Sequence, residues 1–562
     1  MALAALCSQI QHNHSSHIFG SQNTESRHSQ LGSFHQVAFK AFVVDHGVRN
    51  GSFDEAHAVA DVLAARGFSR HLSHGSGKLI LLLGIETKVL QIDWAPFEKP
   101  AELPNFESLA RKYRYQVLGN ACRAGGINSL FLAHHEDDQV ETVMIRLIGG
   151  HKRLGLMGMK AVSEIPECYG IHGVHESGGR PNSSLVQNQE AHRRGKHTSY
   201  KTTQNRVATN RQAKPQLYLE SGGIRVYRPL LNFNKGRLIA TCQDQETEWF
   251  EDQTNNDPTL TLRNAIRHMY NSHTLPSALS KPAILKMLHK CQDTANTQLR
   301  VVESCLSRCI IKAFDTRAGT LRIVFNNMND SALPSATDKK LIAANLLRRV
   351  TMLVTPREHV PLPTLHDALK NIFPEVFSSA EPISKPVGFT AGGLYFQPLA
   401  THETTPSFSS KCEWLISRQP YDSIAALPLI TFPPLKGSSW SNWTLYDGRY
   451  WIRIQNLSEK PVFVRPFRHT DYDEFRHLFA PHTRSSLHES LKKVAPGNIR
   501  FTLPSIVRRE DWKDTVIALP TLNARAPEYK GLLSWEVRYK KVDLAGLSIP
   551  NQDFEGVEAT AS

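Results

Sequence analysis

The sequence predicts an α/β fold built on a parallel sheet, most clearly in the segment from Leu130 to Ile148. Its first four residues, Leu130–Ala133, form an apolar run, which is typical of a strand buried on both faces. From residue 136 onward, apolar side chains recur at helical spacing, so a helix is expected to follow at once. Another amphipathic helix is expected before the strand, over Phe106–Ala124. This alternation is typical of parallel sheets with helical crossovers.

Polar side chains gather where this strand ends and its helix begins. His134 and His135 follow the strand, Asp137 lies at the helix start, and Asp138 and Glu141 share the helix face opposite the apolar stripe. Ligands of open α/β sheets bind beyond the carboxyl ends of the strands. A well-capped helix start is the plainer alternative, because acids are favoured there. It explains one aspartate better than two histidines, two aspartates and a glutamate within eight residues.

The pattern HHxDDxxET, from His134 to Thr142, resembles the signature of the tRNA(Ile)-lysidine synthase family of N-type ATP pyrophosphatases. Val44–Arg49 looks like the family's VDHGLR block. Three further blocks resemble the family's RPLL, W-x-x-D-x-[ST]-N and RNxIR: Arg228–Leu231, Trp249–Asp257 and Arg263–Arg267. The blocks keep the family's order. The resemblance covers residues 1 to about 270.

The resemblance implies an adenine-nucleotide α-hydrolase-like, Rossmann-like parallel sheet with helices on both faces, followed by a mixed α+β C-terminal region. The family's SGGxDS loop aims backbone N–H groups at pyrophosphate. No such loop occurs in these 562 residues, and Met1–Cys7 is similar to the small-residue helix that follows it. We therefore expect a fungal-type member that is truncated at its N-terminus and lacks the first strand and the PP-loop.

The resemblance also implies a ligase that forms a C–N bond. Such an enzyme uses ATP and Mg²⁺ to adenylate the 2-oxygen of the wobble cytidine in the isoleucine tRNA with a CAU anticodon. The side-chain amine of free L-lysine then displaces AMP and gives lysidine. The resemblance implies a mitochondrial location as well.

Site roles follow from the same resemblance. The expected catalytic residues are Asp138 and Glu141, which would hold lysine, together with His134 and Asp137. Asp137 and Asp138 are the expected Mg²⁺ ligands. The residues expected to bind the nucleotide are His135, Asp45, His46 and Arg228. The residues expected to contact tRNA, lysine or phosphate are Arg263, Asn264, Arg267, Asp252 and Asn255.

A purely structural role, in helix capping and turn formation, is an equal alternative for four of the residues in this region: Asp252, Asn255, Asp257 and Asn264.

Two other functions stay open. A non-catalytic tRNA-binding remnant would have lost ATP binding with the loop. Another PP-loop enzyme of tRNA modification would usually carry catalytic cysteine pairs, and the eight cysteines of this chain include no CxxC pair. We read them as reduced, buried thiols.

Composition suits a nucleic-acid enzyme without proving one. The net charge is +14 over 562 residues, and a basic surface attracts polyanions. No apolar run is long enough to span a membrane. The oligomeric state is not predicted.

The chain is expected to hold several regions. Residues 1–165 and 221–274 form the catalytic domain, and residues 166–220 form a disordered basic insertion. The insertion is either a flexible arm for tRNA or a tolerated surface loop. A mostly helical region, 275–435, and a β-rich region, 436–562, follow.

Individual elements are expected in the C-terminal half. Helices are predicted over 280–314 and 338–354, and a hairpin with an Asp-Gly turn over Trp443–Ile454. Val462–Phe467 reads as a strand with its arginines pointing outward. Aromatic and Arg side chains recur here and suit base stacking, but a small β-rich core is the simpler account.

Overall fold

The computed structural model describes residues 1–19, 38–65, 85–95, 97–179, 216–251, 257–328, 336–377, 386–399, 412–422, 426–437, 439–510 and 513–549. The chain divides into two compact units. The first unit consists of Met1–Cys168 and Ile224–Asn296, and the second of Tyr169–Gly223 and Thr297–Ser562. Over the described residues, no helix has the length and apolar character needed to cross a membrane.

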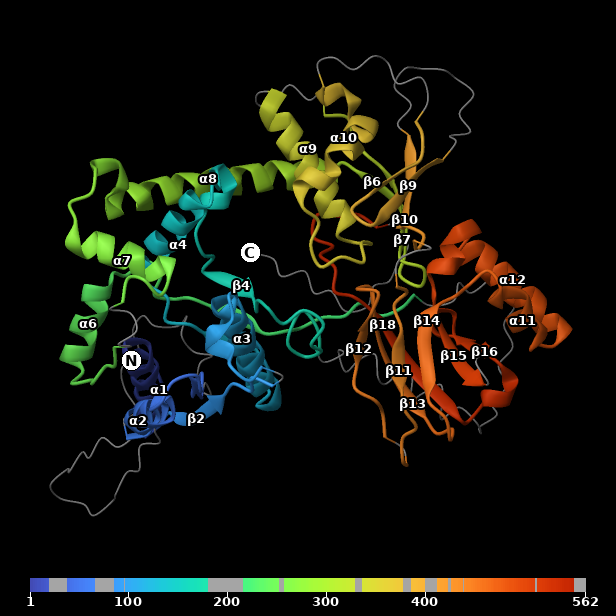
Figure 1. Ribbon diagram of the computed structural model, residues 1–562. Helices are drawn as coiled ribbons and strands as arrows, with labels where there is room; N and C mark the ends of the chain where they lie inside the picture. Colours follow the sequence, from blue (N-terminus) through green and yellow to red (C-terminus); the bar gives the residue numbers. More distant parts are fainter. Residues whose placement is uncertain are drawn as a thin grey trace. The chain divides into compact units, whose positions relative to one another are not determined.

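The first unit alternates helices and strands, drawn in blue to green in Figure 1. Its elements in chain order are α1 (Ala2–Phe19), β1 (Lys40–Asp45), α2 (Ser52–Ala65), β2 (Glu86–Gln91), α3 (Phe106–Ala124), β3 (Ser129–Phe131), α4 (Glu136–Ile148), β4 (Val162–Glu164), β5 (Arg225–Tyr227), α6 (Lys235–Asp244), α7 (Leu262–Ser272) and the start of α8 (Lys281–Ser307). The predicted succession of helix, strand and helix is confirmed in α3, β3 and α4.

The strands of this unit form two sheets. β1 and β2 are parallel, with Asp45 opposite Gln91. β3 and β5 are parallel, with Leu130 opposite Val226, and β4 pairs antiparallel with β5. Within the described part of the chain, no strand pairing joins the two sheets. The carboxyl ends of β1 and β3 carry the polar residues singled out in the sequence.

Helix α4 is buried on two sides. Val140, Val143 and Met144 pack in an apolar cluster with Ile266 of α7 and Leu288 of α8. Ile148, expected on the same stripe, is 59% exposed because it lies at the helix end. The opposite face is also covered, because its carboxylates lie against α7. The sequence pattern predicted the apolar face and could not predict the cover on the polar one.

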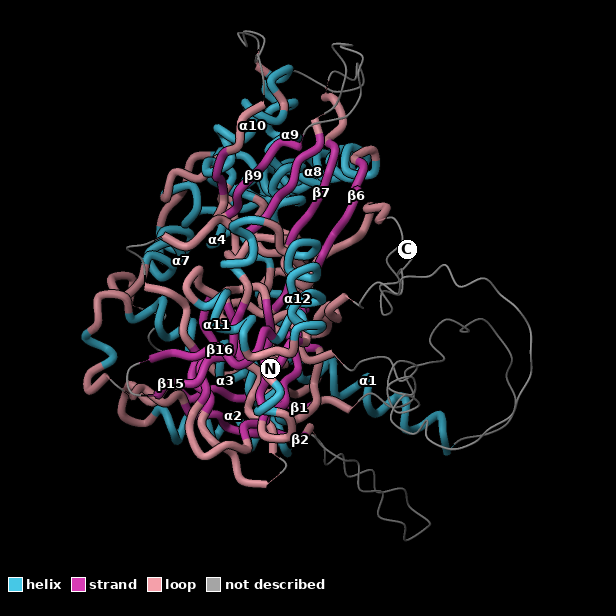
Figure 2. The backbone as a smooth tube through the Cα atoms, turned by 90° about the vertical axis from the view of Figure 1, so that its right-hand side faces the viewer, coloured by secondary structure: helices cyan, strands magenta, loops and turns pink. Residues whose placement is uncertain are grey.

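The second unit contains three antiparallel sheets, whose strand orders are β6-β7-β10-β9-β8, β11-β14-β15-β16-β17 and β12-β13-β18. Figure 2 shows β6, β7 and β9 in the first of these sheets, where β10 lies between β7 and β9. The elements of the second unit, in chain order, are β6 (Ile310–Asp315), β7 (Thr320–Val324), α9 (Ala336–Thr351), α10 (His366–Ile372), β8 (Phe389–Ala391), β9 (Leu394–Leu399), β10 (Glu413–Arg418), β11 (Ile430–Phe432), β12 (Thr444–Tyr446), β13 (Tyr450–Asn456), β14 (Val462–Pro466), α11 (Asp471–His477), α12 (Pro481–Val494), β15 (Pro504–Glu510), β16 (Lys513–Leu519), β17 (Ala524–Arg525) and β18 (Leu533–Tyr539).

The prediction that residues 275–435 are mostly helical is wrong in part. Helix α9 lies close to its predicted range, and α8 begins as predicted but ends at Ser307, because residues 310–314 of the predicted helix belong to strand β6. A five-stranded sheet, β6 to β10, occupies much of the rest. β7 shows why this sheet was missed: four of its five residues are buried. A strand buried on both faces lacks the alternation by which short strands are recognised.

The predicted hairpin is confirmed in β12 and β13, where Thr444 lies opposite Ile452. Asp447 and Gly448 have φ values of +46° and +60°, as two-residue turns with positive φ at both positions require. Tyr450 and Trp451 are buried, so these aromatic residues belong to the core of the sheet.

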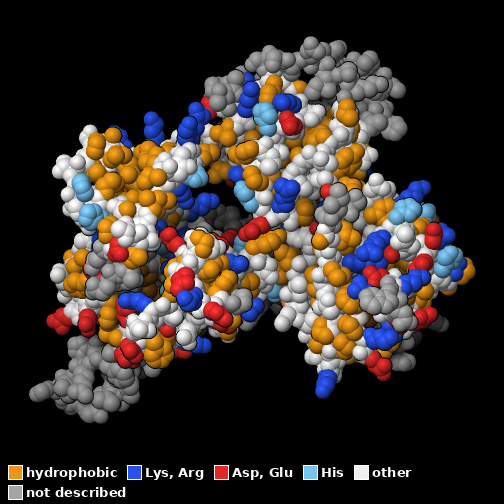
Figure 3. Space-filling model, in the orientation of Figure 1, with side chains coloured by type: hydrophobic (Ala, Val, Ile, Leu, Met, Phe, Trp, Pro, Cys, Tyr) orange, Lys and Arg blue, Asp and Glu red, His pale blue; other side chains and the backbone are white. Residues whose placement is uncertain are grey.

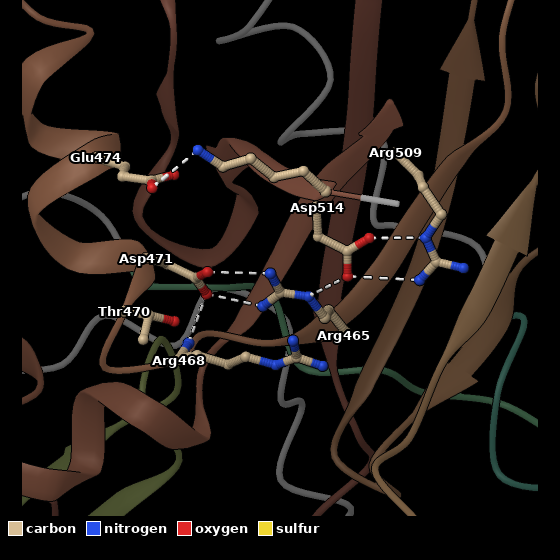
Figure 4. Close-up of a pocket in the computed structure, with 8 residues that line it drawn as sticks. Arg465, Arg468, Thr470, Asp471, Glu474, Arg509 and Asp514 are labelled. Atoms are coloured by element: carbon tan, nitrogen blue, oxygen red, sulfur yellow. Dashed lines mark hydrogen bonds and ion pairs between the residues drawn. The ribbon is translucent and has the colours of Figure 1, made fainter. Parts of the chain in front are cut away.

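The prediction of outward-pointing arginines on β14 is wrong at Arg465, which is 2% exposed. Its guanidinium donates to both carboxylate oxygens of Asp471, at 2.7 and 3.0 Å, and to Asp514 at 3.1 Å (Figure 4). Figure 3 shows basic and acidic side chains interspersed in this region of α11, α12 and β14–β16. The carboxylates of Asp471 and Asp514 replace the hydrogen bonds to water that the Arg465 guanidinium loses on burial.

The insertion predicted over residues 166–220 is structured at its flanks, against expectation. The backbone N–H of Gly179 donates to the carbonyl of Ser221 at 2.7 Å, and that of Glu220 donates to Tyr539 at 2.7 Å. Burial opposes ionisation of Glu220, but hydrogen bonds and charge from His172 and Arg538 outweigh it and lower its pKa. Residues 180–215 lie outside the described part, so the disorder prediction stays a prediction there.

Candidate functional site

Several buried polar atoms in the first unit lack a partner at the strand ends. Asp45, at the end of β1, is 2% exposed, and one carboxylate oxygen accepts the N–H of Gly47 at 2.8 Å. Its other oxygen, and the Nδ1 atoms of His134 and His135, have no hydrogen-bond partner among the described residues. Buried polar atoms are rarely left unpaired, because that costs free energy. Each of these atoms is therefore a candidate contact for a polar ligand at the end of its strand.

The first turn of α4 is fixed by its own acids. Asp138 accepts the backbone N–H of His135 at 2.9 Å and so caps the helix. Asp137 accepts the backbone N–H of Lys235 at 3.0 Å and pairs with the ammonium of Lys281. Burial disfavours the Asp137 carboxylate, but these two hydrogen bonds and the charge of Lys281 outweigh it and lower its pKa. Asp137 is therefore ionised and held by two elements, α6 and α8.

Two arginines of α7 clamp the remaining acids of α4. Arg267 donates to both oxygens of Glu141, at 2.7 and 3.1 Å, and Arg263 donates to Glu141 at 2.9 Å. Asp138 lies farther away, at 3.5 Å from Arg263 and 3.8 Å from Arg267. The two arginines are one turn apart on α7, and the two acids are three residues apart on α4. The basic face of α7 therefore lies against the acidic face of α4.

A pocket of about 230 Å³ opens beside this clamp. It is smaller than a typical ligand pocket of roughly 300–1,000 Å³, so it would hold part of a nucleotide. Its lining combines apolar residues with an arginine, a histidine and an aspartate: Arg114, Tyr115, Leu118, Leu132, Ala133, His134 and Asp138. Glu141 does not line it.

His134 is neutral at neutral pH. Burial lowers its pKa to about 4; Asp138 opposes the shift, while Arg228, Arg263 and Arg114 add to it. An uncharged imidazole can donate from one ring nitrogen and accept at the other. It therefore suits polar contacts with a nucleotide without adding charge.

This shift predicts a pH dependence of stability. The pKa of His134 in the folded chain is below its usual value of about 6.5, so between those values the unfolded chain binds the extra proton. Stability should fall as pH drops through this window. His134→Gln should weaken that dependence, as measured by urea unfolding at several pH values from 7 to 4. An unchanged slope in the variant would contradict the assignment.

The structure brings most of the predicted site residues together: His134, His135, Asp137, Asp138, Glu141, Arg263 and Arg267. Others have structural contacts. The Arg228 guanidinium donates to the carbonyl of Lys160 at 2.9 Å and to the hydroxyl of Ser163 at 3.1 Å. The carbonyl of His46 accepts from Trp94 at 2.6 Å.

The loop before α7 is tied by Asn264, which is 6% exposed. Its side-chain amide donates to the carbonyl of Asp257 at 2.9 Å, and its backbone N–H donates to Thr261, which caps α7. A turn-forming role fits these contacts better than contact with tRNA. Asp252 and Asn255 lie outside the described residues, and their roles stay predictions.

Three site cations were missed in the sequence. Arg114 on α3 is exposed, lines the pocket, and has no ion-pair partner in the described part of the chain. Its spacing from Arg111, three residues earlier on the same helix, was the available signal. Lys235 and Lys281 come from segments far along the chain, and only the packing of α6 and α8 reveals them.

The carboxylates of Asp137 and Asp138, the expected Mg²⁺ ligands, do not form a metal site that is open to an ion. Both oxygens of Asp137 accept hydrogen bonds from lysines, and those of Asp138 face the His135 N–H and the arginines. Within the described ranges, no group of three His, Cys, Asp or Glu could hold a metal ion. The nucleotide fits better, because the pocket is lined by His134 and Arg114, whose Nδ1 atom and guanidinium have, respectively, no hydrogen-bond partner and no ion-pair partner among the described residues.

Comparison with known proteins supports the family that the sequence blocks resemble. The PP-loop domain family matches residues 17–172 and 207–273, which include the site residues discussed above except Lys281. A protein of Schizosaccharomyces pombe described as a probable tRNA(Ile)-lysidine synthase is 26% identical over 489 residues, 86% of this chain and 84% of its own length.

Two bacterial relatives match over shorter stretches. A tRNA(Ile)-lysidine synthase of Novosphingobium aromaticivorans is 34% identical over 23% of this chain and 32% of its own length. One of Lactiplantibacillus plantarum is 25% identical over 49% and 46%. The chain thus aligns with most of the fungal relative and with less than half of each bacterial one.

Proposed function

We propose that this chain, which matches the PP-loop domain family and is similar to proteins described as tRNA(Ile)-lysidine synthases, ligates free lysine to the wobble cytidine of the isoleucine tRNA with a CAU anticodon. The observation that carries the proposal is the acid–arginine clamp of α4 and α7 beside a pocket at the strand ends. The reaction would consume ATP and release pyrophosphate and AMP.

The first step needs cations and donors around the triphosphate. ATP supplies the adenylate that makes the cytidine 2-oxygen a leaving group. Arg114 lines the pocket, has no ion-pair partner among the residues that the structure describes, and would contact phosphate, while neutral His134 would hydrogen-bond the nucleotide. Mg²⁺ would enter with ATP and offset part of the phosphate charge.

The second step needs lysine placed beside the activated cytidine. Asp138 lines the pocket, and its contacts with the arginines are long, at 3.5 and 3.8 Å. It is therefore the carboxylate best placed to hold the lysine ammonium. Both oxygens of Glu141 are already occupied, so its role would be to position Arg263 and Arg267. The arginines would in turn face the lysine carboxylate.

Arg114→Ala should raise the KM for ATP about tenfold, with a smaller effect on kcat, because it removes one charge-assisted contact to phosphate. Arg111→Ala is the matched control. Arg111 lies on the same helix but pairs with Glu167 at 3.3 Å and does not line the pocket. Equal KM values for ATP in the two variants would remove Arg114 from the site.

The function is tested by lysine-dependent release of AMP and pyrophosphate. The assay would compare the CAU-anticodon tRNA with the same tRNA carrying a different anticodon. It would use the 562-residue chain and a fusion in which a strand and SGGxDS loop from a relative precede Met1.

Turnover that requires both lysine and the CAU anticodon supports the proposal. Tight tRNA binding without turnover by either protein would favour the binding remnant. ATP consumption independent of lysine would favour another tRNA-modifying enzyme of the PP-loop class.

The mitochondrial location is also a proposal, supported by the resemblance alone. Cell fractionation of a C-terminally tagged chain tests it, and recovery in the cytosolic fraction would contradict it.

A further inference from the structure

A second pocket, of about 240 Å³, lies entirely within the second unit, at the turn between β12 and β13. Its residues come from the segment after Cys168, the end of α9, the hairpin turn and the chain after β18. Apolar and charged groups share its lining: Tyr169, Gly170, His175, Glu176, Arg349, Met352, Leu353, Arg357, Glu358, Leu445, Gly448, Trp451, Lys540, Lys541, Val542 and Asp543. The function proposed above uses none of them.

Lys540 lies in this pocket without a charge partner. Its backbone N–H donates to the carbonyl of Arg449 at 2.8 Å, and its ammonium donates to the carbonyl of Thr355. Within the described residues, no carboxylate lies within ion-pair distance of its Nζ. A buried ammonium that is not paired with an acid is costly.

The environment favours the neutral amine. Burial is the largest cause that lowers the pKa of Lys540 to about 7, and Arg449 adds to it; Glu176 and Asp447 oppose the shift. Asp447 gives weak compensation because it also pairs with Arg418 at 3.2 Å and with Arg449 at 2.8 Å. A neutral lysine amine is a nucleophile that forms Schiff bases with carbonyl compounds.

The remaining groups around the amine select a ligand. Leu353 and Trp451 are 1% and 3% exposed and give the pocket apolar walls. Arg349 is neutralised by Asp543. Arg357 has no ion-pair partner in the described part of the chain. An unpaired guanidinium near an amine suits a ligand that carries a carboxylate.

The other titratable groups at this pocket are Tyr169, His175, Glu176, Glu358 and Lys541. His175 lies 3.8 Å from Glu176 and packs edge-on against Tyr169. Burial, together with Glu358, Asp447 and Glu176, raises the pKa of Tyr169 to about 12. Tyr169 therefore keeps its proton near neutral pH and adds no negative charge at the pocket.

We propose that this pocket binds a small 2-oxo acid and that Lys540 condenses with its carbonyl group to form an imine. The amine nitrogen adds to the carbonyl carbon, the carbonyl oxygen takes up two protons and leaves as water, and a carbon–nitrogen double bond remains. No oxidant or second substrate is needed, and water reverses the step. Arg357 holds the carboxylate of the ligand. The inference does not depend on the proposed ligase activity.

The test uses glyoxylate as the probe and borohydride to trap the imine, with peptide mass spectrometry to locate it. At pH 7 the neutral fraction of Lys540 exceeds that of a lysine with the usual pKa of about 10.4 by roughly a thousandfold. We expect Lys540 to be labelled at least about tenfold faster than the exposed Lys436 and Lys530, with the rate rising through pH 7. Labelling of Lys540 no faster than these two lysines overturns the proposal.

Arg357→Ala separates ligand selection from amine reactivity. It should slow trapping of glyoxylate about tenfold, the effect of losing one ionic contact, while leaving trapping of uncharged propanal unchanged. Lys540→Met should abolish the labelled peptide, with circular dichroism as the check on folding. If Lys540→Met does not fold, the comparison of glyoxylate with propanal in Arg357→Ala still tests the proposal. Equal slowing with both aldehydes would contradict a carboxylate-binding role.

Discussion

Asp138→Asn is expected to raise the KM for lysine about 100-fold, because truncating a buried charged partner costs about 2–5 kcal/mol. Asp138 lines the pocket and is 9% exposed, so its charge is poorly screened by water. The adenylation half-reaction, followed by pyrophosphate exchange without lysine, should change much less. This split distinguishes lysine binding from a general loss of structure.

Glu136→Gln is the matched control, because Glu136 lies on the same helix but belongs to neither the pocket nor the arginine clamp. It should leave both half-reactions within about twofold, as for substitutions away from such features. If Asp138→Asn leaves the lysine KM unchanged, or if pyrophosphate exchange falls in parallel, Asp138 does not bind lysine.

Arg465→Met is expected to lower the free energy of unfolding by about 3–5 kcal/mol, because it leaves buried carboxylates uncompensated. Asp471 is 6% exposed, and both of its oxygens accept from Arg465. Arg468→Met is the control: Arg465 and Arg468 line one pocket (Figure 4), but Arg468 is exposed. Its effect should stay within about 0.5 kcal/mol. Similar losses in both variants, measured by urea unfolding, would contradict the buried network.

The same network gives a pH signature. The hydrogen bond from Arg509 is the largest cause that lowers the pKa of Asp514, and Arg465 adds to it although partial burial opposes it. A carboxylate with a lowered folded-state pKa stabilises the fold above its unfolded pKa and loses that effect as pH falls. Acid sensitivity below about pH 4 should therefore be weaker in Arg465→Met.

The sequence located the site because its signals are local. The strand end at Leu130–Ala133 and the start of α4 lie next to each other in the chain, so the pattern of His134 to Glu141 was sufficient. The clamp was not predictable in the same way. Arg263 and Arg267 lie more than 120 residues beyond Glu141, and only the packing of α7 on α4 brings them there.

Other errors have similar physical causes. Strand β7 was missed because four of its five residues are buried, so it lacks an alternating pattern. Arg465 was expected to point outward because charged residues usually do, but two distant carboxylates make burial tolerable. The flanks of the basic insertion were expected to be disordered, yet Gly179 bonds to Ser221 and Glu220 bonds to Tyr539 of β18 through their backbones.

The most direct measurement of the central claim is the transfer of isotopically labelled lysine to tRNA. The CAU-anticodon isoleucine tRNA would be incubated with ATP, labelled lysine and the chain or its SGGxDS fusion, digested to nucleosides, and analysed by mass spectrometry. If the chain ligates lysine to cytidine, a labelled lysine–cytidine adduct forms at the wobble position, and Asp138→Asn reduces its amount at limiting lysine. Absence of the adduct with both proteins, while each still binds the tRNA, would contradict it.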